Sequence, residues 1–193
     1  MARTPRNARR GARPRPTRRQ QRLSFAAIEI VGGLLTPDVF NRIAAPEGDA
    51  ATRRGYTIAE GLDLRDEIAR AYRMAEAQWT GFDAAKDDDF GLPARFMPQF
   101  LSSVFGFDDL GPVAPVRKGE RTFPIGHAAR DGRIPVVIAP VVSDDQRRSG
   151  LDTLQQTFAD GNRRRSATQL LQEYLNAEDD CLWGIATDGL TLR

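Results

Sequence analysis

Cysteine, histidine and long apolar runs are scarce in this chain of 193 residues, and each scarcity excludes a class of structure. The one cysteine, Cys181, cannot form a disulfide within the chain, which fits a reducing compartment and predicts a cytoplasmic protein. The one histidine, His127, has no second histidine or nearby cysteine with which to bind zinc. No apolar run approaches the roughly 18 residues of a transmembrane helix, so we expect no membrane partner.

The motifs of several enzyme classes are also missing. Neither the P-loop pattern G-x-x-x-x-G-K-[ST] nor the nucleophile elbow G-x-S-x-G occurs. No Gly-rich loop leads to the Asn/Asp-Pro-Pro-aromatic motif that grips a flipped adenine. We interpret Cys181 as a buried structural thiol and His127 as a hydrogen-bonded residue at a strand end. The chain therefore has no predicted catalytic residue, metal site or cofactor site.

Charge is distributed very unevenly along the chain. Residues 1–22 contain nine arginines and no acidic residue, and they are rich in proline. Removing these nine from the 28 basic residues leaves 19 against 26 acidic residues, so 23–193 carries a net charge of −7. The composition predicts a disordered basic tail on an acidic body. The tail is either an arm that neutralises nucleic-acid phosphates or an incidental extension, and the sequence leaves both open.

Residues 23–110 are predicted to be a helical region. A strand or extended segment at 25–35 precedes a helix start at Thr36-Pro37. The clearest helix spans 63–79 and has one apolar face, formed by Leu64, Ile68, Ala71, Tyr72, Ala75 and Trp79. After an acidic loop at 81–91, a second helix is expected at 92–105, with Gly106 as its C-cap.

Residues 111–193 are predicted to be a mixed α/β region. Two strands, 121–127 and 134–142, flank a turn at Asp131-Gly132, and a short helix is expected within the polar segment 143–165. The remaining elements are a helix from Ser166 to Asn176, a strand at 182–185, a turn at Asp188-Gly189 and a return strand at 190–192. The fold class is α+β (α/β), a small mixed sheet flanked by helices. Because the return strand is so short, we expect the chain to continue beyond Arg193 in a full-length homologue.

Three blocks of sequence resemble a known family. The first block begins with Gln172-Glu173-Tyr174-Leu175-Asn176 and acidic residues, and it continues with Leu182-Trp183-Gly184-Ile185 and Asp188-Gly189-Leu190-Thr191-Leu192-Arg193. The second block is Ile30-Val31-Gly32-Gly33-Leu34-Leu35. The third block is Phe123-Pro124-Ile125-Gly126-His127. Together they resemble the N-terminal region of large DNA adenine methyltransferases of type IIG restriction-modification and phage-defence systems. The resemblance covers 25–193. It implies DNA as a partner. The remainder of a split methyltransferase, or other defence-system subunits, are the further partners implied.

 The resemblance also implies S-adenosylmethionine as the cofactor of the full-length family, and we expect no segment of this chain to bind it.

The order of elements after residue 92 also resembles the core of PD-(D/E)xK restriction nucleases, which are fused to methylases in type IIG enzymes. Such a core holds a divalent metal with an acid on one strand and an acid-x-Lys on the next. The strand at 134–142 has no acid and no lysine, and Asp144-Asp145 is followed by Gln146. We therefore expect a degenerate restriction-endonuclease-like domain, with Asp131, Asp144 and Asp145 as the remaining nuclease positions.

Basic residues near the last helix are the predicted DNA contacts. Arg163, Arg164 and Arg165 immediately precede the Ser166 cap, and a helix N-terminus attracts phosphate. Arg147 and Arg148 lie in the same polar segment.

Three functions remain open from the sequence. The first is a DNA-engaging portion of a restriction or phage-defence methyltransferase without catalytic motifs. The second is a non-catalytic protein-interaction domain with an incidental basic tail. The third is a metal-dependent nuclease that uses Asp131, Asp144 or Asp145.

Overall fold

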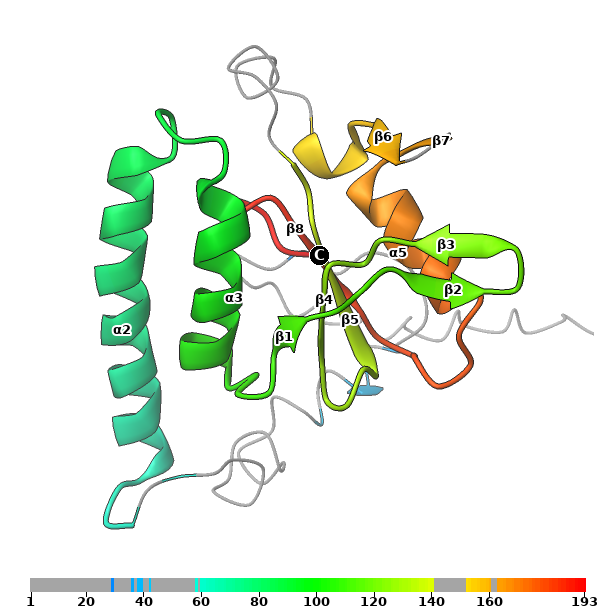
Figure 1. The fold of residues 1–193 in the computed structure, drawn as a ribbon. Helices are drawn as coiled ribbons and strands as arrows, with labels where there is room; N and C mark the ends of the chain where they lie inside the picture. Colours follow the sequence, from blue (N-terminus) through cyan, green and yellow to red (C-terminus); the bar gives the residue numbers. More distant parts are fainter. Residues whose placement is uncertain are drawn as a thin grey trace, which may run out of the picture. The chain divides into compact units, whose positions relative to one another are not determined.

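The computed structural model (Figure 1) describes residues 60–140, 152–160 and 163–193, together with the isolated residues 29, 36, 38, 39, 42 and 58. The predicted tail at 1–22 lies outside the described residues. The chain divides into two compact units, Met1–Leu64 and Arg65–Arg193, and the elements below belong to the second apart from the first residue of its first helix. Among the described residues, no helix is long and apolar enough to cross a membrane.

Two helices open the second unit. Helix α2 spans Leu64–Ala85, so it runs through the predicted end at residue 79 and through Gly81. Helix α3 spans Leu92–Phe105, as predicted, and it ends at Gly106, whose φ of 72° is the left-handed conformation that glycine adopts most readily. Aromatic rings pack between the two helices, with the centroids of Phe82 and Phe96 4.3 Å apart.

A four-stranded mixed sheet follows. Its strands lie in the order β1 (Gly111–Pro112), β4 (His127–Ala129), β5 (Ile134–Ile138) and β8 (Ile185–Thr187). The first three are antiparallel neighbours, whereas β5 and β8 are parallel. Helix α5 (Ala167–Leu175) lies in the connection between the two parallel strands, as a parallel pair requires. The predicted α+β class with a small mixed sheet is confirmed.

Helices cover both faces of this sheet (Figure 1). Successive side chains of a strand point to opposite faces, and β5 follows this rule. Val136 packs in a cluster with Met97 and Leu101 of α3. Val137 packs in a second cluster with residues of α5, among them Leu170. The nearly continuous apolar run of β5 is therefore explained by burial on both sides.

Two hairpins lie outside the sheet. One consists of β2 (Val116–Lys118) and β3 (Arg121–Phe123), and the other of β6 (Phe158–Asp160) and β7 (Arg163–Arg165). The predicted single strand at 121–127 is thus wrong, because Gly126, with a φ of 89°, separates β3 from β4. In the polar segment, the described part of the predicted helix is only a single 3-10 turn, η3 (Thr153–Gln155), before β6.

The last elements agree largely with the prediction. Ser166 caps α5 and Asn176 ends it. The turn at Asp188-Gly189 reverses the chain, and Ala186 and Arg193 exchange two backbone hydrogen bonds of 2.7 and 2.8 Å. The strand before this turn lies later than the predicted 182–185, because β8 spans Ile185–Thr187. The predicted return strand at 190–192 is reduced to an isolated antiparallel bridge between Thr187 and Leu192.

Candidate nucleic-acid interface

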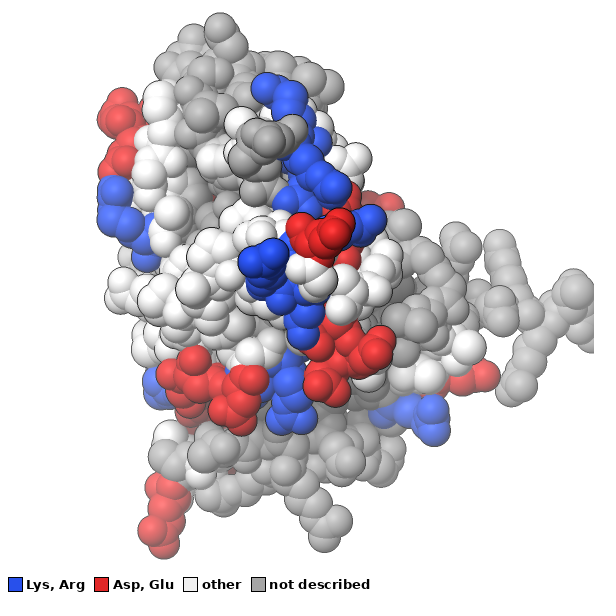
Figure 2. All heavy atoms as spheres, turned by 45° about the vertical axis from the view of Figure 1, so that its right-hand side comes forward, with Lys and Arg blue, Asp and Glu red and all other residues white. Residues whose placement is uncertain are grey.

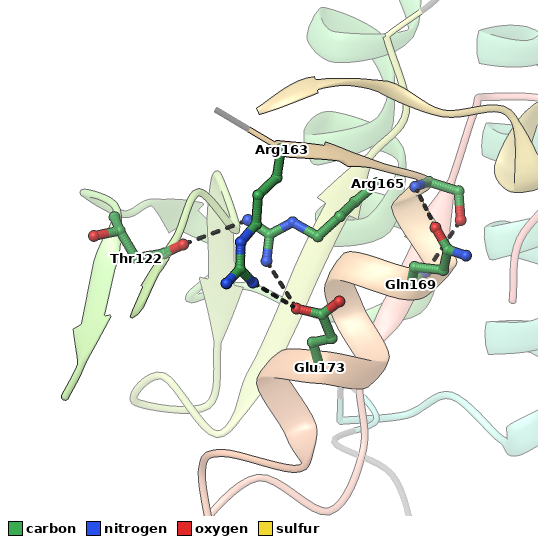
Figure 3. Close-up of polar contacts among 6 residues, drawn as sticks. Thr122, Arg163, Arg165, Gln169 and Glu173 are labelled. Carbon is green, nitrogen blue, oxygen red and sulfur yellow. Dashed lines mark hydrogen bonds and ion pairs between the residues drawn. The ribbon is translucent and has the colours of Figure 1, made fainter. Parts of the chain in front are cut away.

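The three consecutive arginines of β7 have different environments. Arg164 pairs with Ala159 of β6 in an antiparallel register, so β7 is a strand at the end of the predicted polar segment 143–165. Alternation along a strand places Arg163 and Arg165 on one side and Arg164 on the other. Figure 3 shows Arg163 and Arg165 converging on Glu173 of α5.

Arg165 is a structural residue. Its side chain is buried, with 5% of the residue exposed. One guanidinium nitrogen, Nη1, donates to Glu173 Oε2 at 3.1 Å, and Nη2 donates to the carbonyl oxygen of Thr122 at 3.4 Å. The guanidinium also lies 5.7 Å from the ring centroid of Phe123. Arg165 thus joins β7 to both α5 and β3, and burial leaves it little surface with which to contact a phosphate.

Arg163 and Arg164 remain accessible. Arg163 Nη1 lies 3.8 Å from the same Glu173 Oε2, and its side chain is 56% exposed. Arg164 is exposed and donates from Nη2 to the carbonyl oxygen of Thr157 at 3.2 Å. Because one carboxylate serves both Arg163 and Arg165, β7 keeps an excess of positive charge at the surface.

The start of α5 faces protein. Ser166 is completely buried, and its hydroxyl accepts from the N–H of Gln169 at 3.2 Å. The Gln169 side chain in turn accepts from the N–H of Ser166 at 3.0 Å. This capping box uses the N–H groups of Ser166 and Gln169, and Ala167 is completely buried, so any phosphate contact here depends on the arginine side chains.

The β2–β3 hairpin adds two exposed arginines that sequence reasoning did not select. Arg117 donates from Nε to the carbonyl oxygen of Gly119 at 3.3 Å, and Arg121 is exposed at the start of β3. Lys118 of the same hairpin forms an ion pair with Glu178. The signal in the sequence was the cluster of basic residues around Gly119-Glu120, a turn pattern.

We define the two-hairpin surface as the exposed arginines of the two hairpins, Arg117, Arg121, Arg163 and Arg164. Because successive residues of a strand point to opposite sides, these arginines lie on both faces of the hairpins. The hydrogen bond from Arg165 to Thr122 places β7 beside β3, so the two hairpins are neighbours. Figure 2 views the unit from the side of these hairpins and shows basic side chains along the face with acidic ones between them. Among the acidic residues here, Glu173 pairs with Arg163, and Glu178 pairs with Lys118 of the β2–β3 hairpin.

The nuclease positions are only partly described. Asp131 is exposed in the turn between β4 and β5, where its N–H donates to Asp109 Oδ2 at 3.3 Å. Both Arg130 and Asp131 have positive φ angles, 54° and 56°, a conformation uncommon outside glycine. Asp144, Asp145, Arg147 and Arg148 lie outside the described residues. Within the described ranges, no group of three or more His, Cys, Asp or Glu side chains could hold a metal ion.

Burial perturbs two further titratable residues. His127 on β4 is half-buried, and burial lowers the pKa of its imidazole. Cys181 is buried, and its thiol donates to the carbonyl oxygen of Gly132 at 3.4 Å. Burial, followed by the negative charge of Glu178, raises the pKa of this thiol. A raised pKa disfavours the thiolate, which is the nucleophilic form.

Comparison with protein-family models, curated proteins and solved structures gives no match to this chain.

Proposed function

We propose that this chain is a DNA-engaging module that contacts phosphates through the two-hairpin surface. The observation that carries the proposal is the placement of four exposed arginines on two neighbouring hairpins. Arginine side chains neutralise phosphates and release counterions, which supplies much of the affinity of DNA-binding proteins. The buried Arg165 of β7 donates a hydrogen bond to Thr122 of β3, which links the two hairpins that carry the exposed arginines.

The order of elements supports a restriction-endonuclease-like origin for the module. Helix α3 precedes three antiparallel strands, and α5 then connects β5 to the parallel strand β8. A nuclease core of this kind needs an acid and a lysine on its central strand, where β5 carries only Ile134, Pro135, Val136, Val137 and Ile138. The proposal is therefore a degenerate domain that keeps DNA contact without cleavage.

The resemblance in the sequence suggests the wider context, a restriction-modification or phage-defence DNA adenine methyltransferase. In that context the remainder of a split methyltransferase or other defence subunits would be the partners, and S-adenosylmethionine would bind outside this chain. The genomic sequence that follows the Arg193 codon tests this context. An Asn/Asp-Pro-Pro-aromatic motif after a Gly-rich strand and loop supports it, and an unrelated gene contradicts it.

DNA contact itself is tested by charge reversal in the full chain. The variant R163E/R164E should bind a duplex about tenfold or more weakly in fluorescence anisotropy, because each removed phosphate contact costs affinity. The matched control is R70E/R73E, which reverses the same number of charges on α2. Equal losses in the two variants would show that only net charge matters and would contradict a site on β7.

A further inference from the structure

Helix α2 exposes an apolar stripe. Ile68, Tyr72 and Trp79 are 59%, 63% and 39% exposed, although the sequence predicted one common apolar face for the helix. The side of α2 that packs against α3 is a neighbouring one, on which Phe82 is buried. Exposed aromatic and branched residues in a row on one helix mark an interaction surface.

The stripe has charged ends of opposite sign. Residues three or four positions apart lie on the same side of a helix, and the seam defined in this way runs through Arg65, Ile68, Tyr72, Glu76, Trp79 and Asp83. A positive residue stands at its N-terminal end and a negative residue at its C-terminal end. When two copies of the seam run in opposite directions, the positive end of each copy therefore lies opposite the negative end of the other.

We propose that α2 pairs in an antiparallel arrangement with α2 of a second copy of this chain. Reversal about a two-fold axis brings Arg65 opposite Asp83 of the second copy, and the same pair forms again at the other end. The apolar residues Ile68 and Trp79 then meet in between. A parallel arrangement would instead place Arg65 against Arg65 and Asp83 against Asp83, which like charges disfavour.

The centre of the seam fits the same arrangement. Tyr72 lies opposite Glu76 of the second copy, and a tyrosine hydroxyl can donate to a carboxylate. Within its own chain, Asp83 accepts from Lys86, whose Nζ lies 2.8 Å from Oδ1. A carboxylate accepts more than one hydrogen bond, so Asp83 can also pair with Arg65. This inference concerns α2 alone and does not depend on DNA binding.

Sedimentation equilibrium of the full chain tests the proposal. The wild type should form a dimer with a dissociation constant on the order of micromolar, as expected for a small interface. I68D, which buries a charge in the apolar seam, should make the chain monomeric. A wild-type chain that stays monomeric at about 100 µM, well above that range, would overturn the proposal.

A charge swap tests the antiparallel direction. R65E and D83R each place like charges opposite each other and should weaken the dimer about fivefold to twentyfold. The double variant R65E/D83R restores opposite charges and should recover most of the lost affinity. R73E is the matched control, because it reverses a charge of α2 outside the seam and should leave the dimer unchanged. A dimer that tolerates I68D and both single reversals would place the interface elsewhere, and circular dichroism confirms that each variant is folded.

Discussion

Arg165 and Glu173 form an ion pair between β7 and α5, with Nη1 3.1 Å from Oε2. The arginine side chain is 6% exposed and the glutamate side chain 37% exposed, so the two partners differ in their access to water. Removing the glutamate leaves a buried guanidinium without this carboxylate, which costs more than the loss of a surface ion pair.

The first prediction follows from this difference. Glu173→Ala should lower the free energy of unfolding by about 1–3 kcal/mol in urea titration. Arg163→Ala, which removes only the exposed partner of the same carboxylate, should change it by less than about 0.5 kcal/mol. Equal effects of the two substitutions would contradict the structural role assigned to Arg165.

A second prediction concerns two glycines. A Cβ at Gly184 would lie 2.6 Å from Leu171 Cδ1 and 3.2 Å from Pro135 Cγ, so Gly184→Ala should destabilise the fold by about 1–3 kcal/mol. Gly81 lies within α2 and has open space around its Cα, so Gly81→Ala should stabilise by about 0.5–1 kcal/mol. Thermal unfolding should show a lower melting temperature for Gly184→Ala and a higher one for Gly81→Ala. An unchanged melting temperature for Gly184→Ala would mean that Leu171 can move aside.

A third prediction concerns pH. Burial lowers the pKa of His127 from its ordinary value of 6.5, so the folded state favours the neutral imidazole. The resulting stability is fully present above pH 6.5 and is lost as the pH falls through the folded pKa. As the solution is acidified, the urea midpoint of the wild type should therefore fall more than the urea midpoint of His127→Gln. A difference that stays constant with pH would show that burial does not perturb this histidine.

A fourth prediction concerns the Cys181 thiol. Its burial and raised pKa both oppose formation of an accessible thiolate, so a disulfide reagent should modify the native protein slowly at neutral pH. The same thiol should react rapidly in urea, where the protein is unfolded. Rapid modification of the native protein would place Cys181 at the surface.

Local signals in the sequence located most of the helices and turns. The glycine at the end of α3 and the serine that caps α5 act through nearby backbone geometry, and the structure confirms both. Such signals involve only a few neighbouring residues, which a single sequence displays.

Tertiary contacts decided what the sequence did not reveal. Arg163–Arg165 has no apolar alternation, and it becomes a strand because β6 pairs with it and Glu173 receives two of its side chains. On α2, periodicity identified apolar positions but could not distinguish the side that packs against α3 from the exposed stripe of Ile68 and Tyr72. The neighbouring β2–β3 arginines were missed for the same reason, since only the fold brings them beside β7.

The salt dependence of DNA binding tests the central claim most directly. The full chain and the quadruple variant R117A/R121A/R163A/R164A would be titrated with one duplex at several salt concentrations. If the two-hairpin surface contacts phosphates, the slope of log affinity against log salt should fall in magnitude by about 3–4, close to 0.9 for each arginine removed. Parallel lines for the two proteins would show that the surface makes no phosphate contact and would contradict the proposed function.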